Sequence, residues 1–237
     1  MASTAYDAHG HPAHGGHDDH PALQHHFESL EQQKESSTLG TWMFLVTEIM
    51  FFGGLFTAYV VYRGMFHGVF AIASSHLNWK LGALNTAVLI ASSLTMAMAI
   101  WAAQMNRRKL IVWFLLLTIA LGSVFLVVKT FEYKEKFDHH LVPGPHFAPD
   151  DPRLQAVSNQ AQVFYSIYFI MTGLHALHMV IGIGLLIWLL FPSWKGKFDS
   201  RYYNPLECTG LYWHFVDLVW IFLFPLLYLL GAHMQAH

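Results

Sequence analysis

The stretch LGALNTAVLIASSLTMAMAIWAAQ, residues 81 to 104, decides the fold class because it contains no charged side chain. About 20 predominantly apolar residues suffice to cross the hydrocarbon core of a bilayer as a helix, so this stretch predicts a transmembrane helix. The whole chain agrees, since 54% of its residues are hydrophobic and only 12% are charged, whereas a soluble domain carries about 25% charged residues.

Four further segments have the length and apolar character of membrane spans. Backbone groups in hydrocarbon must be satisfied within their own segment, which selects helices, and the period-two alternation of barrel strands is absent. We therefore predict an all-α, polytopic membrane helix bundle over residues 38–237. Its five transmembrane helices are expected at about 39–62, 81–104, 110–128, 163–191 and 211–231.

Residues 1–37 are polar and histidine-rich, and they lack the basic start and apolar core of a secretory signal. Such a composition buries too little apolar area to order itself, which predicts a disordered tail. Histidine-rich tracts can bind metal ions, but the spacing here is irregular and favours a solvated tail. The seven histidines are His9, His11, His14, His17, His20, His25 and His26.

Basic residues in the short connections predict the orientation, because such loops remain in the cytoplasm. A third loop, about 129–162, also holds Lys129, Lys134, Lys136 and Arg153, and its prolines prevent it from being helical throughout. We predict a cytoplasmic N-terminus and a periplasmic C-terminus in a bacterial cytoplasmic membrane. The inner connections would then hold Arg107, Arg108, Lys109, Lys195, Lys197 and Arg201, and the first outer loop only Arg63 and Lys80.

Tryptophans near the predicted span ends fit the role of interfacial anchors. They are Trp42, Trp79, Trp188, Trp194 and Trp213. The single cysteine, Cys208, excludes an intrachain disulfide and a cysteine cluster for metal. A net charge of −2 gives no indication of a nucleic-acid partner.

Ionisable side chains within the spans are candidate functional residues, because each is costly in hydrocarbon and needs a partner. His175 and His178 lie about 60° apart around a helix and share one face, so they cannot supply both axial ligands of a haem. The single HxxH also lacks the additional histidine boxes of membrane di-iron enzymes. We therefore interpret both histidines as buried, neutral and hydrogen-bonded to neighbouring helices.

His214 and Asp217 also lie three residues apart and could bond to each other, as a structural clamp rather than a catalytic dyad. Glu48 stands alone in TEIMFFGGLF, with no basic residue within two turns. It is a candidate for proton handling or for sensing lipid headgroups. A protonated carboxyl bonded across a helix interface is an equal alternative.

Five phrases resemble subunit III of the haem-copper terminal oxidases, in that family's order and over most of residues 39 to 231. They are TEIMFFGGLFTAY, LGALNTAVLIASSLTMAMAIWA, FEYKE, FYSIYFIMTGLHALHMVIG and ECTGLYWHFVDLVWIFLFPLLYLL. The resemblance implies an accessory subunit bound to subunit I, in a complex that includes subunit II. Haem and copper are expected in those partners and not in this chain. The complex would reduce oxygen to water with electrons from cytochrome c or quinol and pump protons.

The resemblance further implies that the chain stabilises subunit I, supports proton uptake and binds phospholipid in a cleft. Many members have seven spans, with a cleft between the first two and the other five, whereas this chain resembles only the last five. The buried polar positions carried over are Glu48, Glu132, His175, His178, Glu207, His214 and Asp217, none of them catalytic or metal-binding.

Among the alternatives, cytochrome c oxidase is favoured by TEIMFF, FEYKE and ECTGLYWHFVD. A subunit of a quinol oxidase and a homologue associated with nitric oxide reduction remain open. A stand-alone transporter is the alternative from another class, although inverted repeats are not visible in the sequence.

Overall fold

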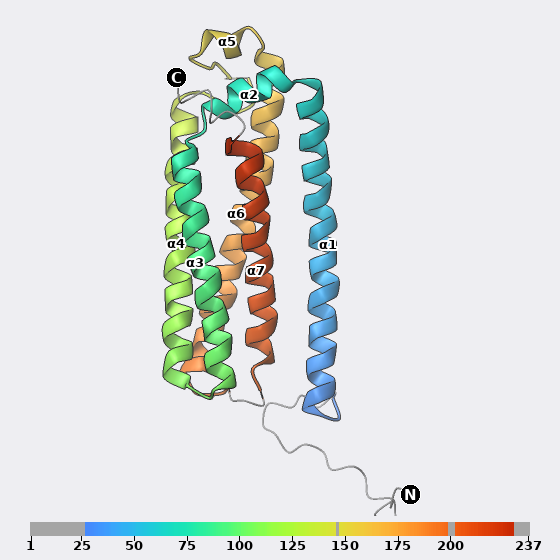
Figure 1. The fold of residues 1–237 in the computed structure, drawn as a ribbon, viewed down its shortest axis with the longest axis vertical. Helices are drawn as coiled ribbons and strands as arrows, with labels where there is room; N and C mark the ends of the chain where they lie inside the picture. The colour runs from blue at the N-terminus through green and yellow to red at the C-terminus, as the bar shows by residue number, and fades with distance from the viewer. Residues whose placement is uncertain (1–26, 146, 199–201, 230–237) are drawn as a thin grey trace, which may run out of the picture.

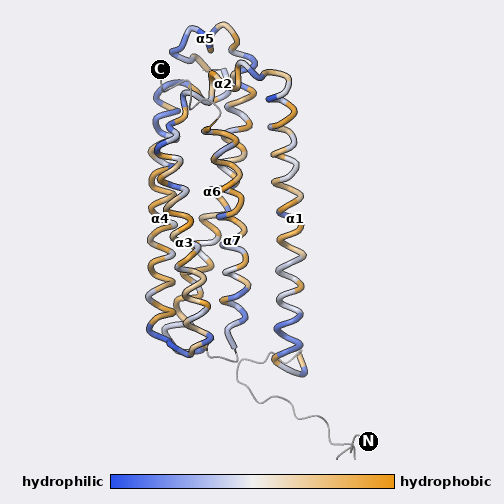
Figure 2. Tube along the Cα trace, viewed as in Figure 1, coloured by the Kyte–Doolittle hydropathy of each residue, from blue (hydrophilic) through white to orange (hydrophobic). Residues whose placement is uncertain are grey.

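The computed structural model describes residues 27–145, 147–198 and 202–229 and is an elongated bundle of helices (Figure 1). Within these residues five helices are long and apolar enough to cross a membrane, which confirms the predicted all-α, five-span architecture. Figure 2 shows their apolar middle parts between more hydrophilic ends. The elements are α1 Leu30–Met65, α2 His67–Ser75, α3 Trp79–Gln104, α4 Arg108–Asp138, α5 Pro152–Gln155, α6 Ser158–Trp194, α7 Asn204–Phe224 and a π-helical turn, Pro225–Leu229.

The first helix begins earlier than predicted. Ser29 is its N-cap, and the Ser29 hydroxyl accepts a hydrogen bond of 3.2 Å from the backbone N–H of Gln32, as a capping serine does. The predicted boundary of the tail at residue 37 is therefore wrong, because residues 30–37 belong to α1. Residues 1–26, with all seven tail histidines, lie outside the described residues.

Helix α4 extends into the region that was predicted to be the third loop. Helix α4 continues to Asp138, so Lys129 and Lys136 lie on a helix and are buried inside the bundle. No glycine or proline interrupts VKTFEYKEKFD, and the helix has no local reason to end at residue 128. Among the described residues of the proline-containing segment that follows, α5 is the one helical turn, so this segment is not helical throughout, as predicted.

The core is organised around α7, which lies between α3 and α1 in Figure 1. Of the residues in its membrane-spanning part 56% are buried, against 17% for α1. Trp213 on α7 is fully buried, and its indole N–H donates to the Ser92 hydroxyl at 3.1 Å. Gly122 and Gly182 make room for the ring, since a Cβ there would lie 2.8 Å and 3.0 Å from it. The prediction that Trp213 is an interfacial anchor is therefore wrong.

Helix α1 packs against α6 and α7 on one flank of the bundle and is held at three heights. Near its start the Lys34 ammonium lies 3.2 Å from a carboxylate oxygen of Glu207. Midway, Glu48 meets His178 on α6. Near its end the Tyr59 hydroxyl donates to the backbone carbonyl of Leu226. These three contacts hold α1 against the bundle and place Glu48 beside α6.

Candidate functional site

Glu48 and His178 form a hydrogen-bonded pair between α1 and α6. His178 Nδ1 lies 2.7 Å from the carbonyl oxygen of Leu174, and Nε2 lies 3.1 Å from Glu48 Oε2. A carbonyl oxygen only accepts, so Nδ1 carries a proton. Either protonated Glu48 then donates to a neutral imidazole, or an imidazolium donates to the carboxylate. In both forms one proton is shared between Oε2 and Nε2.

The surroundings of the pair fix the position of the imidazole. The Phe52 ring packs 5.3 Å from it, centroid to centroid, and the Tyr212 hydroxyl donates to the His178 backbone carbonyl at 2.9 Å. The two side chains keep some exposure, 12% for His178 and 18% for Glu48. The prediction of hydrogen bonding to a neighbouring helix is thus confirmed for His178.

The Glu48–His178 pair lines a cleft of about 670 Å³ between α1, α6 and α7. Its walls are mostly apolar, and the Lys34–Glu207 ion pair lies near its other end, beside Ser37 and Cys208. Glu207 does not itself line the cleft, although its neighbour in sequence, Cys208, does. The further lining residues are Gly40, Thr41, Phe44, Ile181, Leu185, Thr209 and Tyr212.

A second polar cluster is fully enclosed between α4, α6 and the π-helical turn. The Lys129 ammonium donates to Glu132 Oε2 at 2.9 Å and to the Tyr228 hydroxyl at 2.8 Å. The hydroxyls of Tyr228 and Tyr168 in turn donate to Glu132 Oε1, at 2.6 and 2.9 Å. Both carboxylate oxygens are thereby satisfied, which is the condition for burying a charged pair.

Lys129 and Glu132 both fall in the predicted third loop, about 129–162, but only Glu132 was a predicted site residue. The signal that could have found Lys129 is its spacing: Lys129 and Glu132 have opposite charge at i and i+3 on one helix face. The Trp220 ring lies 5.1 Å from the ammonium, a distance at which a cation is attracted to an aromatic face.

The other predicted site residues lie apart from the cleft. His175 is 1% exposed, and within the described part of the chain neither ring nitrogen has a hydrogen-bond partner. The prediction of a bond to a neighbouring helix is therefore wrong for His175. Its ring packs instead against Trp220 and Phe125, at 5.2 and 5.4 Å.

His214 and Asp217 do not bond to each other, so that prediction is wrong as well. The His214 ring is turned towards α3, where Nδ1 lies 2.6 Å from the Ser93 hydroxyl. Both Asp217 oxygens are buried without a hydrogen-bond partner among the described residues. The i, i+3 spacing places His214 and Asp217 on one face of α7, but the partner of His214 is a residue of the neighbouring helix α3.

The two histidines of TGLHALH have different surroundings. Both nitrogens of His178 are already engaged, and aromatic rings enclose His175. Within the described ranges there is also no group of three or more His, Cys, Asp or Glu residues placed to hold a metal ion.

These features define a class of protein: an integral membrane protein of five long helices whose ionisable residues are held within the bundle or at its clefts. A family model described as cytochrome c oxidase subunit III matches residues 24–139 and 154–232. The chain belongs to this family.

Relatives from several bacteria support this membership. The chain is 33% identical over 196 residues to a probable cytochrome c oxidase subunit 3 of Nocardia farcinica, covering 81% of this chain and 86% of the relative. It is 32% identical over 205 residues to a cytochrome c oxidase subunit 3 of Thermostichus vulcanus, covering 86% and 92%. A probable quinol oxidase subunit 3 of Staphylococcus haemolyticus is 29% identical over 206 residues, with 86% and 94% covered.

Proposed function

We propose that this chain is an accessory subunit of a proton-pumping cytochrome c oxidase, bound directly to subunit I in a complex that includes subunit II. Haem and copper belong to those partners, and cytochrome c is the electron donor to the complex. The observation that carries the specific role is the Glu48–His178 pair, which shares one proton at a membrane cleft. The chain itself performs no redox step.

The geometry of the pair supports a role in proton uptake. Glu48 is partly exposed to the cleft, so it can exchange a proton there, while His178 holds its own Nδ1 proton against Leu174. Conversion between the neutral and charged forms of the pair needs only one proton to cross one hydrogen bond. Because the bond already exists, this conversion requires no movement of a helix. The pair is suited to holding a proton at this cleft.

The cleft is also suited to a phospholipid. Its apolar walls match an acyl chain, and the hydroxyls of Ser37 and Thr41 lie towards the end where Lys34 and Glu207 meet. A headgroup at this end would find a cation and hydrogen-bonding groups, while the chains extend towards Phe44 and Ile181. The first two spans of the seven-span members are absent from this chain, and an extended subunit I could supply an equivalent pair.

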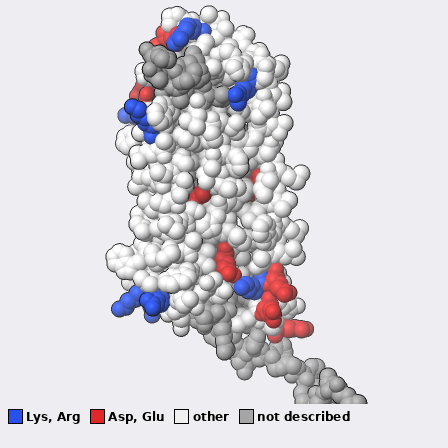
Figure 3. Space-filling view, in the orientation of Figure 1, with Lys and Arg blue, Asp and Glu red and all other residues white. Residues whose placement is uncertain are grey.

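The distribution of charge supports a cytoplasmic N-terminus. Charged side chains gather at the two ends of the molecule (Figure 3). Lys129 and Lys136 weakened the orientation rule when they were counted as loop residues, but both are buried. Without them, the end that carries Arg107, Arg108 and Lys109 is favoured as the cytoplasmic side. We infer a bacterial cytoplasmic membrane with the C-terminus on the periplasmic side.

A quinol oxidase is the second candidate, because a relative named as its subunit 3 covers a similar share of the chain. The relatives with 33% and 32% identity, which are named as subunits of cytochrome c oxidase, favour the first candidate. A visible spectrum and a subunit list of the purified complex separate the two. Covalently bound or co-purifying cytochrome c supports the first, and a complex that oxidises quinol without cytochrome c supports the second.

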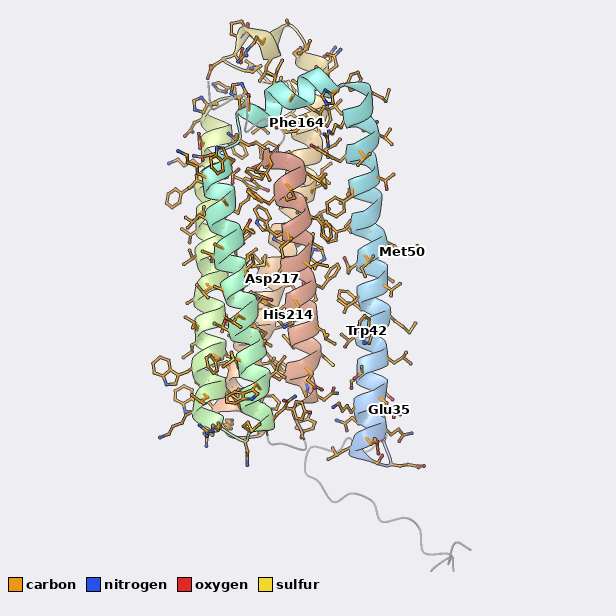
Figure 4. All side chains as sticks on the ribbon, in the orientation of Figure 1. Glu35, Trp42, Met50, Phe164, His214 and Asp217 are labelled. Atoms are coloured by element: carbon orange, nitrogen blue, oxygen red, sulfur yellow. The ribbon has the colours of Figure 1, made fainter. Side chains whose placement is uncertain are left out.

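The substitution Glu48→Gln tests the role of the pair. The glutamine amide can still donate to Nε2 but cannot transfer the proton, so we expect unchanged haem absorbance and several-fold slower proton uptake by the purified complex. Glu35→Gln, an exposed position near the start of the same helix (Figure 4), is the matched control and should leave uptake unchanged. Normal uptake in Glu48→Gln contradicts the proton role. Loss of haem from that variant contradicts the accessory assignment.

A further inference from the structure

A groove of about 390 Å³ runs along the membrane-spanning surface between α3 and α7. It is separate from the cleft beside α1, since the two share no lining residue. Figure 4 places two of its polar residues, His214 and Asp217, between these helices. Ser93 on α3 is the third. The groove thus brings a carboxyl, an imidazole and a hydroxyl to the middle part of the bundle.

Asp217 is the residue of this groove that lacks a partner. It is 3% exposed, and neither carboxyl oxygen has a hydrogen-bond partner in the described part of the chain. The Ser93 hydroxyl lies near the carboxyl but within hydrogen-bond distance only of His214 Nδ1, at 2.6 Å. A buried carboxyl without a partner is costly, and more so where hydrocarbon surrounds the protein.

The rim of the groove is apolar and exposed. Leu94 and Ile90 on α3 face Leu218 and Ile221 on α7, and all four are exposed. Small exposed residues on α3, among them Ala97, would allow another helix to approach closely. An apolar rim around an unpartnered carboxyl matches the anatomy of a helix–helix contact within a membrane.

The outer face of α4 provides a contrast. Between residues 110 and 128 its exposed side chains are all apolar, for example Trp113, Leu117 and Val124. Acyl chains cover such a face without penalty. They cannot do the same for the groove, since an acyl chain has no donor for the Asp217 carboxyl. The unpartnered carboxyl therefore favours a protein occupant over lipid.

We propose that the α3–α7 groove is the docking site for a transmembrane helix of subunit I, which inserts a hydrogen-bond donor towards Asp217 and a polar contact towards His214. This inference rests on the proposed function, which supplies the partner subunit. It adds the surface that the partner uses and the chemistry that recognises it. Leu94 and Leu218 pack against the apolar residues of the incoming helix.

Photo-cross-linking in native membranes tests the site in the assembled complex. A photoreactive residue replaces Leu94 in the groove, 63% exposed, or Leu117 on the outer face of α4, 47% exposed, as the matched control. We expect Leu94 to yield an adduct with the haem-bearing subunit, identified by mass spectrometry, and Leu117 to yield lipid adducts only. Lipid alone at Leu94, a second copy of this chain there, or adducts with the haem-bearing subunit from both positions overturns the proposal.

A substitution series provides a second measurement. Leu94→Trp fills the groove from an exposed position and should lower the amount of this chain that co-purifies with haem by about tenfold, which corresponds to about 1.4 kcal/mol. Leu117→Trp should leave co-purification unchanged. Asp217→Asn, which keeps hydrogen bonding, should retain more association than Asp217→Ala. Equal co-purification of Leu94→Trp and Leu117→Trp overturns the proposal.

The outcomes also separate this inference from the function on which it rests. If the unsubstituted chain does not co-purify with haem, the proposed function fails and the docking site with it. If it does co-purify while Leu94 fails to cross-link to the haem-bearing subunit, only the docking site is wrong.

Discussion

The Lys129 ammonium lies 2.9 Å from Glu132 Oε2 inside the bundle, and the two side chains are only 3% and 2% exposed. Tyr168 and Tyr228 complete the hydrogen bonding of the carboxylate. The pair joins α4 to α6 and to the π-helical turn at the end of α7. Because each charge neutralises the other in a dry environment, the two residues are expected to tolerate substitution together better than singly.

Lys129→Met should lower the free energy of unfolding by about 3–5 kcal/mol, because it leaves the Glu132 carboxylate buried without its counter-charge. The double variant Lys129→Met with Glu132→Leu should be less destabilised than Lys129→Met alone. Thermal unfolding of the purified complex, followed through release of this subunit, measures both. Additive losses in the double variant would show that the two side chains act independently.

Gly122 tests the packing around Trp213. A methyl group at Gly122 would lie 2.8 Å from the Trp213 ring, whereas one at Gly184 meets nothing within 4 Å. Gly122→Ala should therefore destabilise the subunit by about 1–3 kcal/mol through overpacking. Gly184→Ala, the control, should be neutral or slightly stabilising, since alanine is the better helix former by about 1 kcal/mol. The melting temperatures of the two variants are compared, and equal shifts would contradict overpacking at Gly122.

The number and approximate location of the spans were predictable from sequence because lipid imposes a simple requirement of length and apolarity. Helix ends were less predictable. Lys129 was assigned to the start of the third loop, yet a helix can continue through a basic residue when a carboxylate follows at i+3 and aromatic rings surround the ammonium. The start at Leu30 was missed for a similar reason, since polar residues can extend a helix beyond the bilayer.

Pairing between helices was not predictable from a single sequence. Glu48 appeared isolated because its partner, His178, is 130 positions away. His214 was paired with Asp217 from spacing alone, whereas the structure pairs it with Ser93 on α3. Which rotamer a side chain adopts depends on the neighbouring helix. The sequence was therefore sufficient to predict the residue types of the candidate site, but not the contacts that these residues make.

Asp151 gives a prediction on pH dependence outside the membrane-spanning segments. Hydrogen bonds from Arg153 lower the pKa of Asp151 to about 2, below the ordinary value of about 3.9. The carboxylate's contribution to stability is thus fully present above the unfolded-state pKa and is lost as the pH falls towards 2. In a His76→Gln background, which removes the imidazole that lies 3.2 Å from Asp151 Oδ2, Asp151→Asn should lower the melting temperature by the same amount at pH 8 and pH 5. A difference that disappears between these two pH values would contradict the assignment.

Substitutions of His175 distinguish a structural role of this buried imidazole from a functional one. The ring packs between Phe125 and Trp220, and its two nitrogens lack hydrogen-bond partners in the described residues. Burial of polar nitrogens without partners is unfavourable, so His175→Leu, which keeps most of the volume, should leave the melting temperature unchanged or raise it. His175→Ala should lower stability by about 2–5 kcal/mol through the cavity it creates.

Turnover of the complex is measured beside stability, because the two readings distinguish the roles of His175. If the imidazole only fills space, His175→Leu keeps normal oxygen consumption and proton uptake, and only the alanine variant is impaired. If His175→Leu is stable yet slow in proton uptake, the ring nitrogens have a function that packing does not explain. Since His175 lies one turn from His178 on α6, that outcome would extend the proton-handling site from the cleft into the interior of the bundle.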